Sequence, residues 1–227
     1  MNISGVILAA GQGTRMKSPL PKVLHNVLGS PMINYAQEAI SDLKNKYVVV
    51  GHQYKTVTVN LFESFIPILQ EEQLGTGHAI SILLESSEYK NDENEYLVVI
   101  PGDVPLIKKE DLQKLIDDVV QEKAAIGIIT AFVDNPYGYG RIVKNNDEFE
   151  KIVEETDASE SEKQINEINS GIYCIEKKFL EKNIGSLETT NIQKEFYLTD
   201  LINIAFQNKL GRVIVQVNED SIQGVNS

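Results

Sequence analysis

The stretch that decides the fold is Leu8-Ala9-Ala10-Gly11-Gln12-Gly13-Thr14-Arg15-Met16, and Pro21-Lys22 follows it a few residues later. The apolar run at residues 5–9 predicts a buried strand, and residues 11–18 predict a loop. Two glycines two positions apart allow positive φ and close backbone approach, so successive N–H groups can converge on phosphate oxygens. Arg15 can hold two phosphate oxygens, and Lys22 adds a point charge. The pattern indicates a polyphosphate-binding loop directly after a strand.

The spacing excludes two common phosphate loops. A Walker loop needs G-x-x-x-x-G-K-[ST], which the interval from Gly11 to Lys22 does not supply. A dinucleotide loop G-x-G-x-x-G would need a glycine where Met16 stands. For the two glycines alone, an ordinary strand-to-helix turn with surface cations remains an alternative. The longer string, with its two cations in an acidic chain, favours the phosphate loop.

Working outward, strand-like and helix-like runs alternate through the first half. The expected strands are residues 5–9, 47–51, 65–69, 96–100 and 125–133, and the expected helices are residues 31–43, 56–62, 77–84 and 108–122. Continuous apolar strands alternating with helices predict an α/β fold, a Rossmann-like mostly parallel mixed sheet with helices on both faces. Ligands of such sheets bind beyond the carboxyl ends of the strands, so the loops after Ala9 and Ile100 are the candidate sites.

The second half is more irregular. It predicts a glycine-tyrosine turn at 136–141, a hairpin from 140–144 and 150–154, a charge-rich loop at 154–163, strands at 171–175 and 212–217, and a helix at 197–207. Hexapeptide periodicity is absent, so the sequence contains no β-helix.

Composition limits the classes of partner. With 227 residues, one large domain, or one domain with a small appendage, is expected. The net charge of −12 disfavours a polynucleotide partner, although it leaves room for an anionic small substrate in a local cationic pocket. The single Cys174 and three scattered His argue against a disulfide framework or a His-based metal site. Apolar runs are too short for a membrane span, and no basic region precedes the first one. The expected compartment is the cytoplasm.

Asp103 is the candidate metal ligand. It follows the apolar run 97–100 through Pro101-Gly102, which places its carboxylate at the carboxyl end of a strand, facing the same crevice as the first loop. A hard oxygen there suits Mg²⁺, which also binds substrate phosphates. A turn Asp that bonds its own backbone ahead of Pro105 is the alternative.

The stretch 70–76 is rich in amides. A Gln side chain offers both a donor and an acceptor, which matches the hydrogen-bonding face of uracil. A solvated loop is the alternative for Gln70 and more so for Gln73. We expect structural roles for His78 and for Cys174.

Seven motifs in order carry a resemblance to a known family. They are residues 8–16, 72–79 (E-Q-L-G-T-G-H-A), 102–106 (G-D-V-P-L), 138–142 (G-Y-G-R-I), 167–172 (E-I-N-S-G-I), 197–200 (Y-L-T-D) and 224–226 (G-V-N). The chain resembles the sugar-1-phosphate nucleotidyltransferases, and within them the uridyltransferase half of the bacterial bifunctional N-acetylglucosamine-1-phosphate uridyltransferase/glucosamine-1-phosphate acetyltransferases. The similarity runs from Ile3 to Asn226.

The resemblance implies a role for each matching residue. Arg15, Lys22 and Asp103 are implied to be catalytic, and Mg²⁺ is implied to bind Asp103 and Asn226. The implied substrate-binding residues are Leu8, Ala9, Ala10, Gly11, Gly13, Lys22, Gly102 and Asp103 around the nucleotide, Gln70, Gly75 and Thr76 at uracil, and Gly140, Glu154, Asn169 and Asn226 toward the sugar phosphate and metal. The family often has Tyr where this chain has Pro101.

The implied reaction joins UTP and N-acetylglucosamine 1-phosphate to give UDP-N-acetylglucosamine and pyrophosphate, for cell-wall precursor synthesis. Alternatives are a relative with another base or sugar, such as glucose 1-phosphate with UTP or dTTP, and a non-catalytic nucleotide-sensing module. The family continues into a β-helix acetyltransferase that forms a trimer, whereas this chain stops at Ser227. We therefore interpret residues 1–227 as the nucleotidyltransferase domain alone, without the β-helix, and expect a truncated, monomeric chain.

Overall fold

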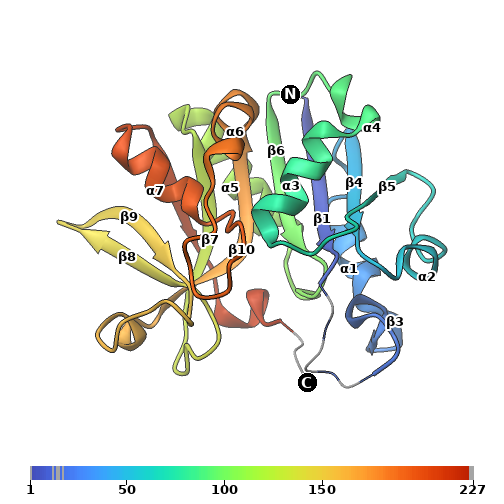
Figure 1. The fold of residues 1–227 in the computed structure, drawn as a ribbon, viewed down its shortest axis with the longest axis horizontal. Coiled ribbons are helices and arrows are strands. Elements are labelled where there is room, and N and C mark those ends of the chain that lie inside the picture. Colours follow the sequence, from blue (N-terminus) through green and yellow to red (C-terminus); the bar gives the residue numbers. More distant parts are fainter. Residues whose placement is uncertain (1, 12, 14–15, 17, 225–227) are drawn as a thin grey trace.

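The computed structural model describes residues 2–11, 13, 16 and 18–224. Over these residues the chain forms a nine-stranded mixed sheet with two helical layers, which confirms the expected α/β class (Figure 1). The sheet order is β11 (Arg212–Gln216), β7 (Ile126–Phe132), β10 (Glu167–Glu176), β6 (Tyr96–Pro101), β1 (Ile3–Ala9), β4 (Asn45–Val50) and β5 (Phe65–Leu69), and the hairpin β8 (Arg141–Asn145) and β9 (Glu148–Val153) branches from β10.

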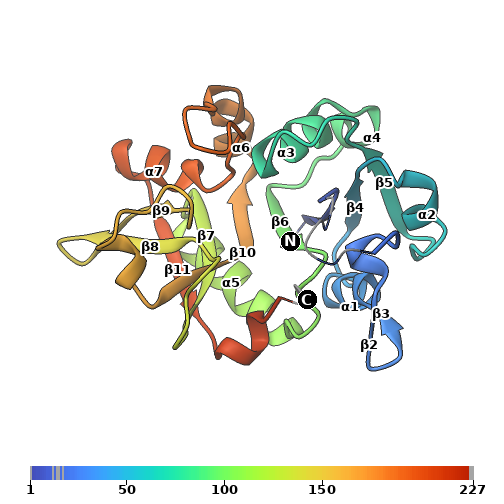
Figure 2. The same cartoon turned by 60° about the horizontal axis from the view of Figure 1, so that its bottom comes forward.

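Period-two alternation on the strands creates two apolar cores. In β1, Val6 contributes to one core and Ile7 to the other, because neighbouring strand residues face opposite sides. Helices α1 (Met32–Ala39) and α5 (Lys109–Glu122) cover one face. Helices α3 (Thr76–Glu85), α6 (Lys177–Asn183) and α7 (Asp200–Gln207) cover the other. Figure 2 shows the two helical layers on opposite sides of the strands.

Most expected elements occur, with shifted ends. Helix α1 ends at Ala39, not 43, and Pro31 precedes it as the N-cap residue. The helix expected at 56–62 is the shorter α2 (Tyr54–Thr58). Shorter elements that the sequence did not suggest are the hairpin β2 (Asn26–Val27) and β3 (Ser30–Pro31), helices α4 (Ser87–Lys90) and α6, and 3-10 turns η2 (Lys22–Leu24), η3 (Glu162–Gln164), η4 (Ile184–Ser186) and η5 (Glu219–Ile222).

Strand β10 differs most from expectation, because it begins at Glu167 and not at 171. Its first residues carry polar side chains, which hid the strand in the sequence. The Glu167 carboxylate is buried and is satisfied there, since it accepts hydrogen bonds from Thr130 (3.0 Å) and Lys144 (2.6 Å). The strand runs antiparallel to both β6 and β7, and its register shifts between Asn169 and Tyr173.

Strand direction places one set of loops together. Strands β1, β4, β5 and β6 are mutually parallel, so their carboxyl ends meet at one edge of the sheet. Because β10 is antiparallel, its amino end lies at that same edge, opposite the carboxyl end of β7. Within the described residues, no helix has the length and apolar character needed to cross a membrane.

Candidate active site

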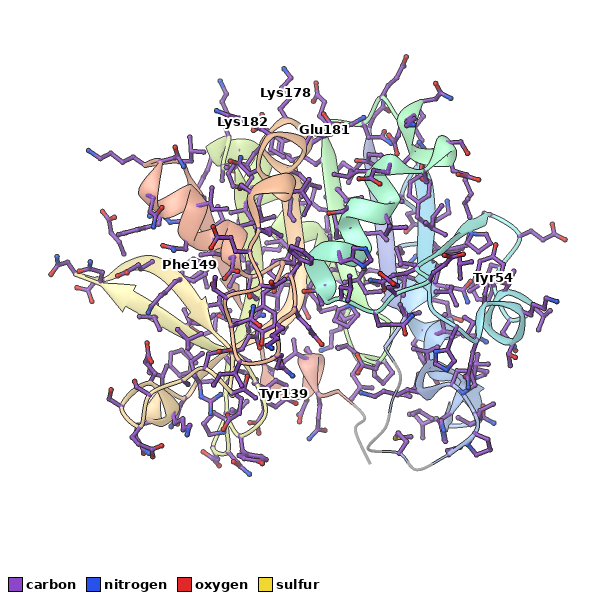
Figure 3. All side chains as sticks on the ribbon, viewed as in Figure 1. Tyr54, Tyr139, Phe149, Lys178, Glu181 and Lys182 are labelled. Atoms are coloured by element: carbon purple, nitrogen blue, oxygen red, sulfur yellow. The ribbon has the colours of Figure 1, made fainter. Side chains whose placement is uncertain are left out.

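A cavity of about 670 Å³ opens at this edge of the sheet. One wall consists of the loop after β1, the segment after β5 and the end of β6, and the facing wall consists of the β7–β8 turn, the end of β9 and the start of β10. Tyr139, which lines the cavity, lies at this edge, whereas Lys178 and Lys182 project from the opposite one (Figure 3). The site thus forms where parallel strands end, as the strand pattern predicted.

The first wall contains a turn whose backbone conformation and close packing require glycine at position 75. Gly75 has φ of +105° and precedes the first residue of α3. A Cβ at this position would lie 2.6 Å from the Phe196 carbonyl oxygen. The hydroxyl of the next residue, Thr76, accepts a hydrogen bond from the Leu198 N–H at 3.0 Å. Residues 196–198 therefore support the turn from behind and hold it against the cavity.

Gln70 lies beside this turn and is almost fully buried, with 2% exposure. Its Nε2 lies 3.0 Å from His78 Nδ1 and 3.5 Å from the Gly75 carbonyl oxygen. Gln73 also lines the cavity, and its Nε2 donates to the Gln70 carbonyl at 3.0 Å. The wall thus presents amide groups held by internal hydrogen bonds.

On the facing wall, three segments distant in sequence meet. The Asn169 N–H donates to the Gly140 carbonyl at 2.9 Å, and the Asn169 side chain donates to the Tyr173 hydroxyl at 2.8 Å. Glu154 accepts a hydrogen bond from the Thr199 hydroxyl at 3.3 Å. A Cβ at Gly140 would lie 3.3 Å from a Glu154 carboxylate oxygen. These groups form a polar surface of carboxylate, amide and hydroxyl, which suits sugar hydroxyls.

This wall is acidic, and its carboxyl groups perturb one another. Burial raises the pKa of Glu154, and the charges of Asp157, Asp200 and Glu195 add to the rise, while the Thr199 hydrogen bond opposes it. Burial also raises the pKa values of Glu195 and Asp200. Ionised carboxylates on this wall are therefore held at a cost in stability.

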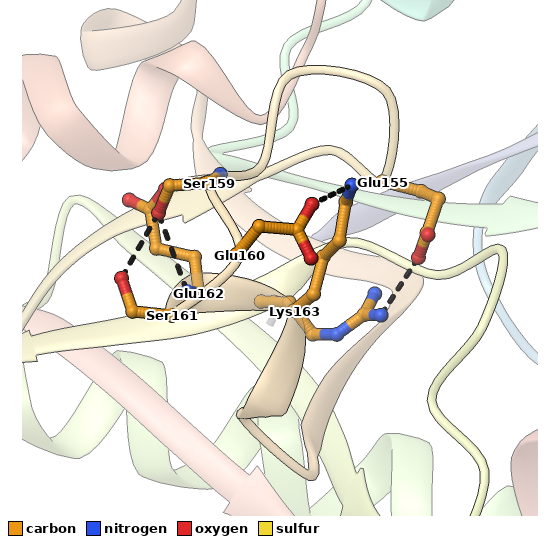
Figure 4. Close-up of polar contacts among 7 residues, drawn as sticks. Glu155, Ser159, Glu160, Ser161, Glu162 and Lys163 are labelled. Carbon is orange, nitrogen blue, oxygen red and sulfur yellow. Dashed lines mark hydrogen bonds and ion pairs between the residues drawn. The ribbon is translucent and has the colours of Figure 1, made fainter.

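A buried ion pair fixes the turn that carries Gly138, Tyr139 and Gly140. Arg141 is 1% exposed and donates to the Tyr139 carbonyl and, at 2.7 Å, to Glu155. The same Glu155 oxygen accepts from the Gly138 N–H at 3.0 Å. Burial acts to raise the pKa of Glu155, but the Gly138 N–H and the Arg141 guanidinium outweigh it and hold the pKa below its usual range. Figure 4 shows Glu155 to the right of the neighbouring contacts of Ser159 with Glu162 and of Glu160 with Lys163.

Lys22 and Asp103 form an ion pair between the start of η2 and the loop after β6. Gly13 comes close to this pair: its φ is +59°, and a Cβ there would lie 2.8 Å from Lys22 Cβ. Gly102 ties the two loops together, since its N–H donates to the Leu8 carbonyl at 2.9 Å. The first loop and the candidate metal ligand are thus adjacent in space.

The structure separates the expected site residues into three sets. Those that line the cavity are Leu8, Ala10, Gly11, Gln70, Gly75, Thr76, Gly140, Glu154 and Asn169. Those that lie at the same edge without lining it are Ala9, Gly13, Lys22, Gly102 and Asp103. Arg15 and Asn226 lie outside the described residues.

Sequence reasoning missed several lining residues. Tyr173, Glu195 and Thr199 also line the cavity. Thr199 lies within the motif at 197–200, but that motif alone gives it no role in the site. Over the described ranges, no three His, Cys, Asp or Glu side chains form a metal-holding group.

Comparisons with known proteins identify the family of this chain. Residues 5–147 match the model of the MobA-like NTP transferase domain. The bifunctional protein GlmU of Carboxydothermus hydrogenoformans is 43% identical over 228 residues, covering 99% of this chain and 50% of that protein. GlmU of Streptococcus thermophilus is 44% identical over 231 residues, covering 100% of this chain and 49% of that protein. The chain therefore spans about half the length of the curated relatives it matches.

Solved structures show the same fold at lower identity. A putative glucose-1-phosphate thymidylyltransferase from Bacillus anthracis superposes with a TM-score of 0.77 at 21% identity, covering 95% of this chain and 87% of that one. A UDP-glucose pyrophosphorylase gives a TM-score of 0.73 at 18% identity, covering 92% and 89%. The resemblance drawn from the sequence motifs is confirmed, and this chain is a nucleotidyltransferase that belongs to the MobA-like NTP transferase family.

Proposed function

We propose that this chain transfers a uridylyl group from UTP to N-acetylglucosamine 1-phosphate, which yields UDP-N-acetylglucosamine and pyrophosphate. The observation that carries the proposal is the two-walled cavity. An amide wall beside a glycine loop faces an acidic wall of Gly140, Glu154 and Asn169. The family-level resemblance, at 43% identity over nearly the whole chain, supports the same pair of substrates.

Each wall has a proposed ligand. The loop at Ala10, Gly11 and Gly13 binds phosphates through its backbone N–H groups, and Gln70 with Gly75 and Thr76 contacts uracil. The facing wall binds the hexosamine, since a carboxylate and an amide can accept and donate hydrogen bonds to sugar hydroxyls.

The reaction needs positioning more than acid–base chemistry. A phosphate oxygen of the sugar phosphate attacks the α-phosphorus of UTP in line, and pyrophosphate leaves. The attacking oxygen is already ionised, so no general base is required. Both substrates are anions, and the loop amides with Arg15 and Lys22 offset their repulsion and hold them in line.

The residues present fit a divalent metal ion, proposed to be Mg²⁺. Asp103 presents a carboxylate at the carboxyl end of β6, and only its Oδ2 is engaged, by Lys22, among the described residues. Mg²⁺ is commonly held by one or two carboxylates with substrate phosphates completing the shell. Asp103 and Asn226 are the proposed ligands, and the ion would neutralise charge on the phosphates.

We further propose that residues 1–227 act as one nucleotidyltransferase domain in the synthesis of a cell-wall precursor in the cytoplasm. The acidic net charge supports small-molecule partners over nucleic acid.

The deciding experiment is a pyrophosphate-release assay over UTP, CTP, dTTP and ATP, each with N-acetylglucosamine 1-phosphate, glucosamine 1-phosphate and glucose 1-phosphate. Release with UTP and N-acetylglucosamine 1-phosphate, above every other pair, is the expected result. A preference for glucose 1-phosphate or for dTTP would move the chain to another branch of the sugar nucleotidyltransferases. Binding of nucleotide without pyrophosphate release from any pair would indicate a sensing module.

A further inference from the structure

Gln70 is buried beside the cavity, and the feature that matters for ligand binding is the orientation of its terminal amide. It is 2% exposed and lines the cavity. Its backbone is fixed on both sides, because its N–H donates to the Val50 carbonyl at 2.8 Å and its carbonyl accepts from Gln73 Nε2 at 3.0 Å. What is left is the orientation of the terminal amide, whose oxygen or whose NH₂ group can be presented to a ligand.

Two contacts of the terminal amide bear on its orientation. Gln70 Nε2 lies 3.0 Å from His78 Nδ1 and 3.5 Å from the Gly75 carbonyl oxygen. The Gly75 carbonyl can only accept, so turning the amide over would bring two oxygens together. His78 Nδ1 accepts as well when the imidazole carries its single proton on Nε2. The Gly75 carbonyl therefore sets the orientation, and the His78 tautomer that fits it has Nδ1 as the acceptor, so that the shorter contact reinforces the same orientation.

The imidazole itself is fixed in place. His78 is the third residue of α3, and its ring packs at 33° to the Phe196 ring with 6.4 Å between centroids. Phe196 is tied to the same loop, because its N–H donates to the Leu74 carbonyl and its carbonyl accepts from the Gly77 N–H, both at 2.8 Å. The ring therefore stays beside the Gln70 amide.

The consequence is that Gln70 presents its acceptor oxygen, Oε1, to a ligand in the cavity. Both Nε2 hydrogens of Gln70 face internal acceptors, and no hydrogen bond among the described residues uses Oε1. An acceptor facing a pyrimidine selects a ring that carries N3–H, as uracil and thymine do. Cytosine has a lone pair at N3, which an oxygen repels.

We propose that His78 is a specificity-determining positioning residue, which locks the Gln70 amide with its oxygen toward the base and so excludes cytosine. This inference rests on the proposed uridylyl transfer, in which Gln70 contacts the base. His78 does not touch the base and acts through Gln70.

The test compares kcat/KM for UTP and CTP in three proteins. His78→Phe keeps a ring against Phe196 and removes the acceptor, whereas His78→Asn places an amide oxygen close to the position of Nδ1. Loss of one neutral hydrogen bond predicts a fall in the UTP:CTP ratio of about fivefold to tenfold in His78→Phe. The ratio should stay near that of the parent in His78→Asn, and the KM for sugar phosphate should be unchanged in both.

A double-mutant comparison separates positioning from packing. In a Gln70→Ala background, His78→Phe should leave the UTP:CTP ratio where Gln70→Ala alone puts it, because the amide it positions is gone. His52→Asn, an exposed histidine in the turn after β4, is the matched control and should behave as the parent. An undiminished ratio in His78→Phe, or an equal loss with and without Gln70, would overturn the inference.

The inference can fail separately from the proposed function. A chain that transfers neither nucleotide contradicts the proposed function, and the same variants are then compared by calorimetric binding of UDP and CDP. A parent preference for UDP that His78→Phe loses and His78→Asn keeps would uphold the role of His78. Equal binding of UDP and CDP by the parent would overturn it.

Discussion

The Glu154 carboxyl group lowers the stability of the fold but lies where it can bind a ligand. Its carboxyl group is partly buried beside Asp157, Asp200 and Glu195, and burial with these charges raises its pKa in the folded chain. A carboxyl whose pKa is higher folded than unfolded stabilises the fold at low pH, and that contribution is lost as pH rises through the folded pKa. Above the usual carboxyl range the raised pKa therefore costs stability, and the place of Glu154 in the cavity lining points to a role in binding.

Replacing Glu154 by Gln should raise Tm by a few degrees at pH 7.5, because the neutral amide removes that cost. The gain should shrink as pH falls toward the usual carboxyl range, since the parent side chain then takes up its proton. The KM for sugar phosphate should rise in the same variant. Thermal unfolding at several pH values, with the exposed Glu63→Gln as control, checks the first two points. A Tm unchanged at every pH would contradict this account of the wall.

Asp103 is the residue on which turnover should depend most. Asp103→Ala removes the proposed metal ligand and the partner of Lys22. We expect kcat/KM to fall more than about a hundredfold, because charge neutralisation at the phosphates is lost. Circular dichroism should show an intact fold, since Asp103 is partly exposed. Asp117→Ala, at an exposed position of α5, is the control, and near-parent turnover of folded Asp103→Ala would refute the role.

At the scale of elements, the first loop depends on close approach of two chain segments. Gly13 has φ of +59° and lies where a Cβ would be 2.8 Å from Lys22 Cβ. Gly13→Ala should raise the KM for UTP by about tenfold or more, because backbone strain of about 1–2 kcal/mol and displacement of Lys22 both act on the phosphate site. Gly185→Ala, where a Cβ meets nothing within 4 Å, is the matched control. A UTP KM equal to that of the control would show that the loop tolerates the change.

The Arg141–Glu155 pair holds the turn that precedes the hairpin of β8 and β9. Glu155→Ala leaves a buried guanidinium without its carboxylate and frees the Gly138 N–H. Breaking a buried pair on one side is costly, so we expect a loss of about 2–3 kcal/mol in the free energy of unfolding. Asp118→Ala, which breaks the exposed pair with Lys114, should cost less than about 0.5 kcal/mol. Urea unfolding measures both, and equal costs would mean that the pair does not anchor the turn.

At the scale of the whole molecule, two sets of carboxyl groups have opposite effects on how stability changes with pH. Those of the acidic wall, Glu154, Glu195 and Asp200, have raised pKa values. Asp92 behaves in the opposite way: burial acts to raise its pKa, but hydrogen bonds from Ser4, Asn94 and Tyr47 hold it below the usual range. The raised groups favour the fold as pH falls, and the lowered groups, which include Asp92 and Glu155, favour it as pH rises.

The two sets together predict a stability maximum between acid and alkaline pH. As pH rises, the wall carboxyls lose protons that the fold favours, and the chain approaches its formal net charge of −12 at pH 7. As pH falls, protonation of Asp92 destabilises the network that joins β1, β4 and the loop before β6. A series of Tm values from pH 3.5 to 8.5 checks this, and a Tm that rises or falls steadily over the whole range would contradict it. The expected monomeric state stays a prediction, which light scattering can test.

The amino-acid sequence was sufficient to predict the fold class, the loop after β1 and the place of Asp103 at the end of β6. The reason is that these features are local: an apolar run predicts a strand, glycines predict the turn after it, and parallel strands bring their carboxyl ends to one edge. The motifs also predicted the family, because their order and spacing are properties of the linear sequence and require no knowledge of tertiary contacts.

The construction of the two cavity walls could not be predicted from the sequence and follows from contacts between distant segments. The start of β10 carries polar residues and a shifted register, so its pattern did not reveal a strand that brings Asn169 to Gly140. The buried Arg141 donates to Glu155, and the same carboxylate accepts from the Gly138 N–H. The spacing of these residues in the sequence does not predict that they meet. The orientation of the Gln70 amide depends on His78, eight residues later and on another element. These features arise from contacts between segments, and such contacts are set by the packing of the whole sheet rather than by local sequence.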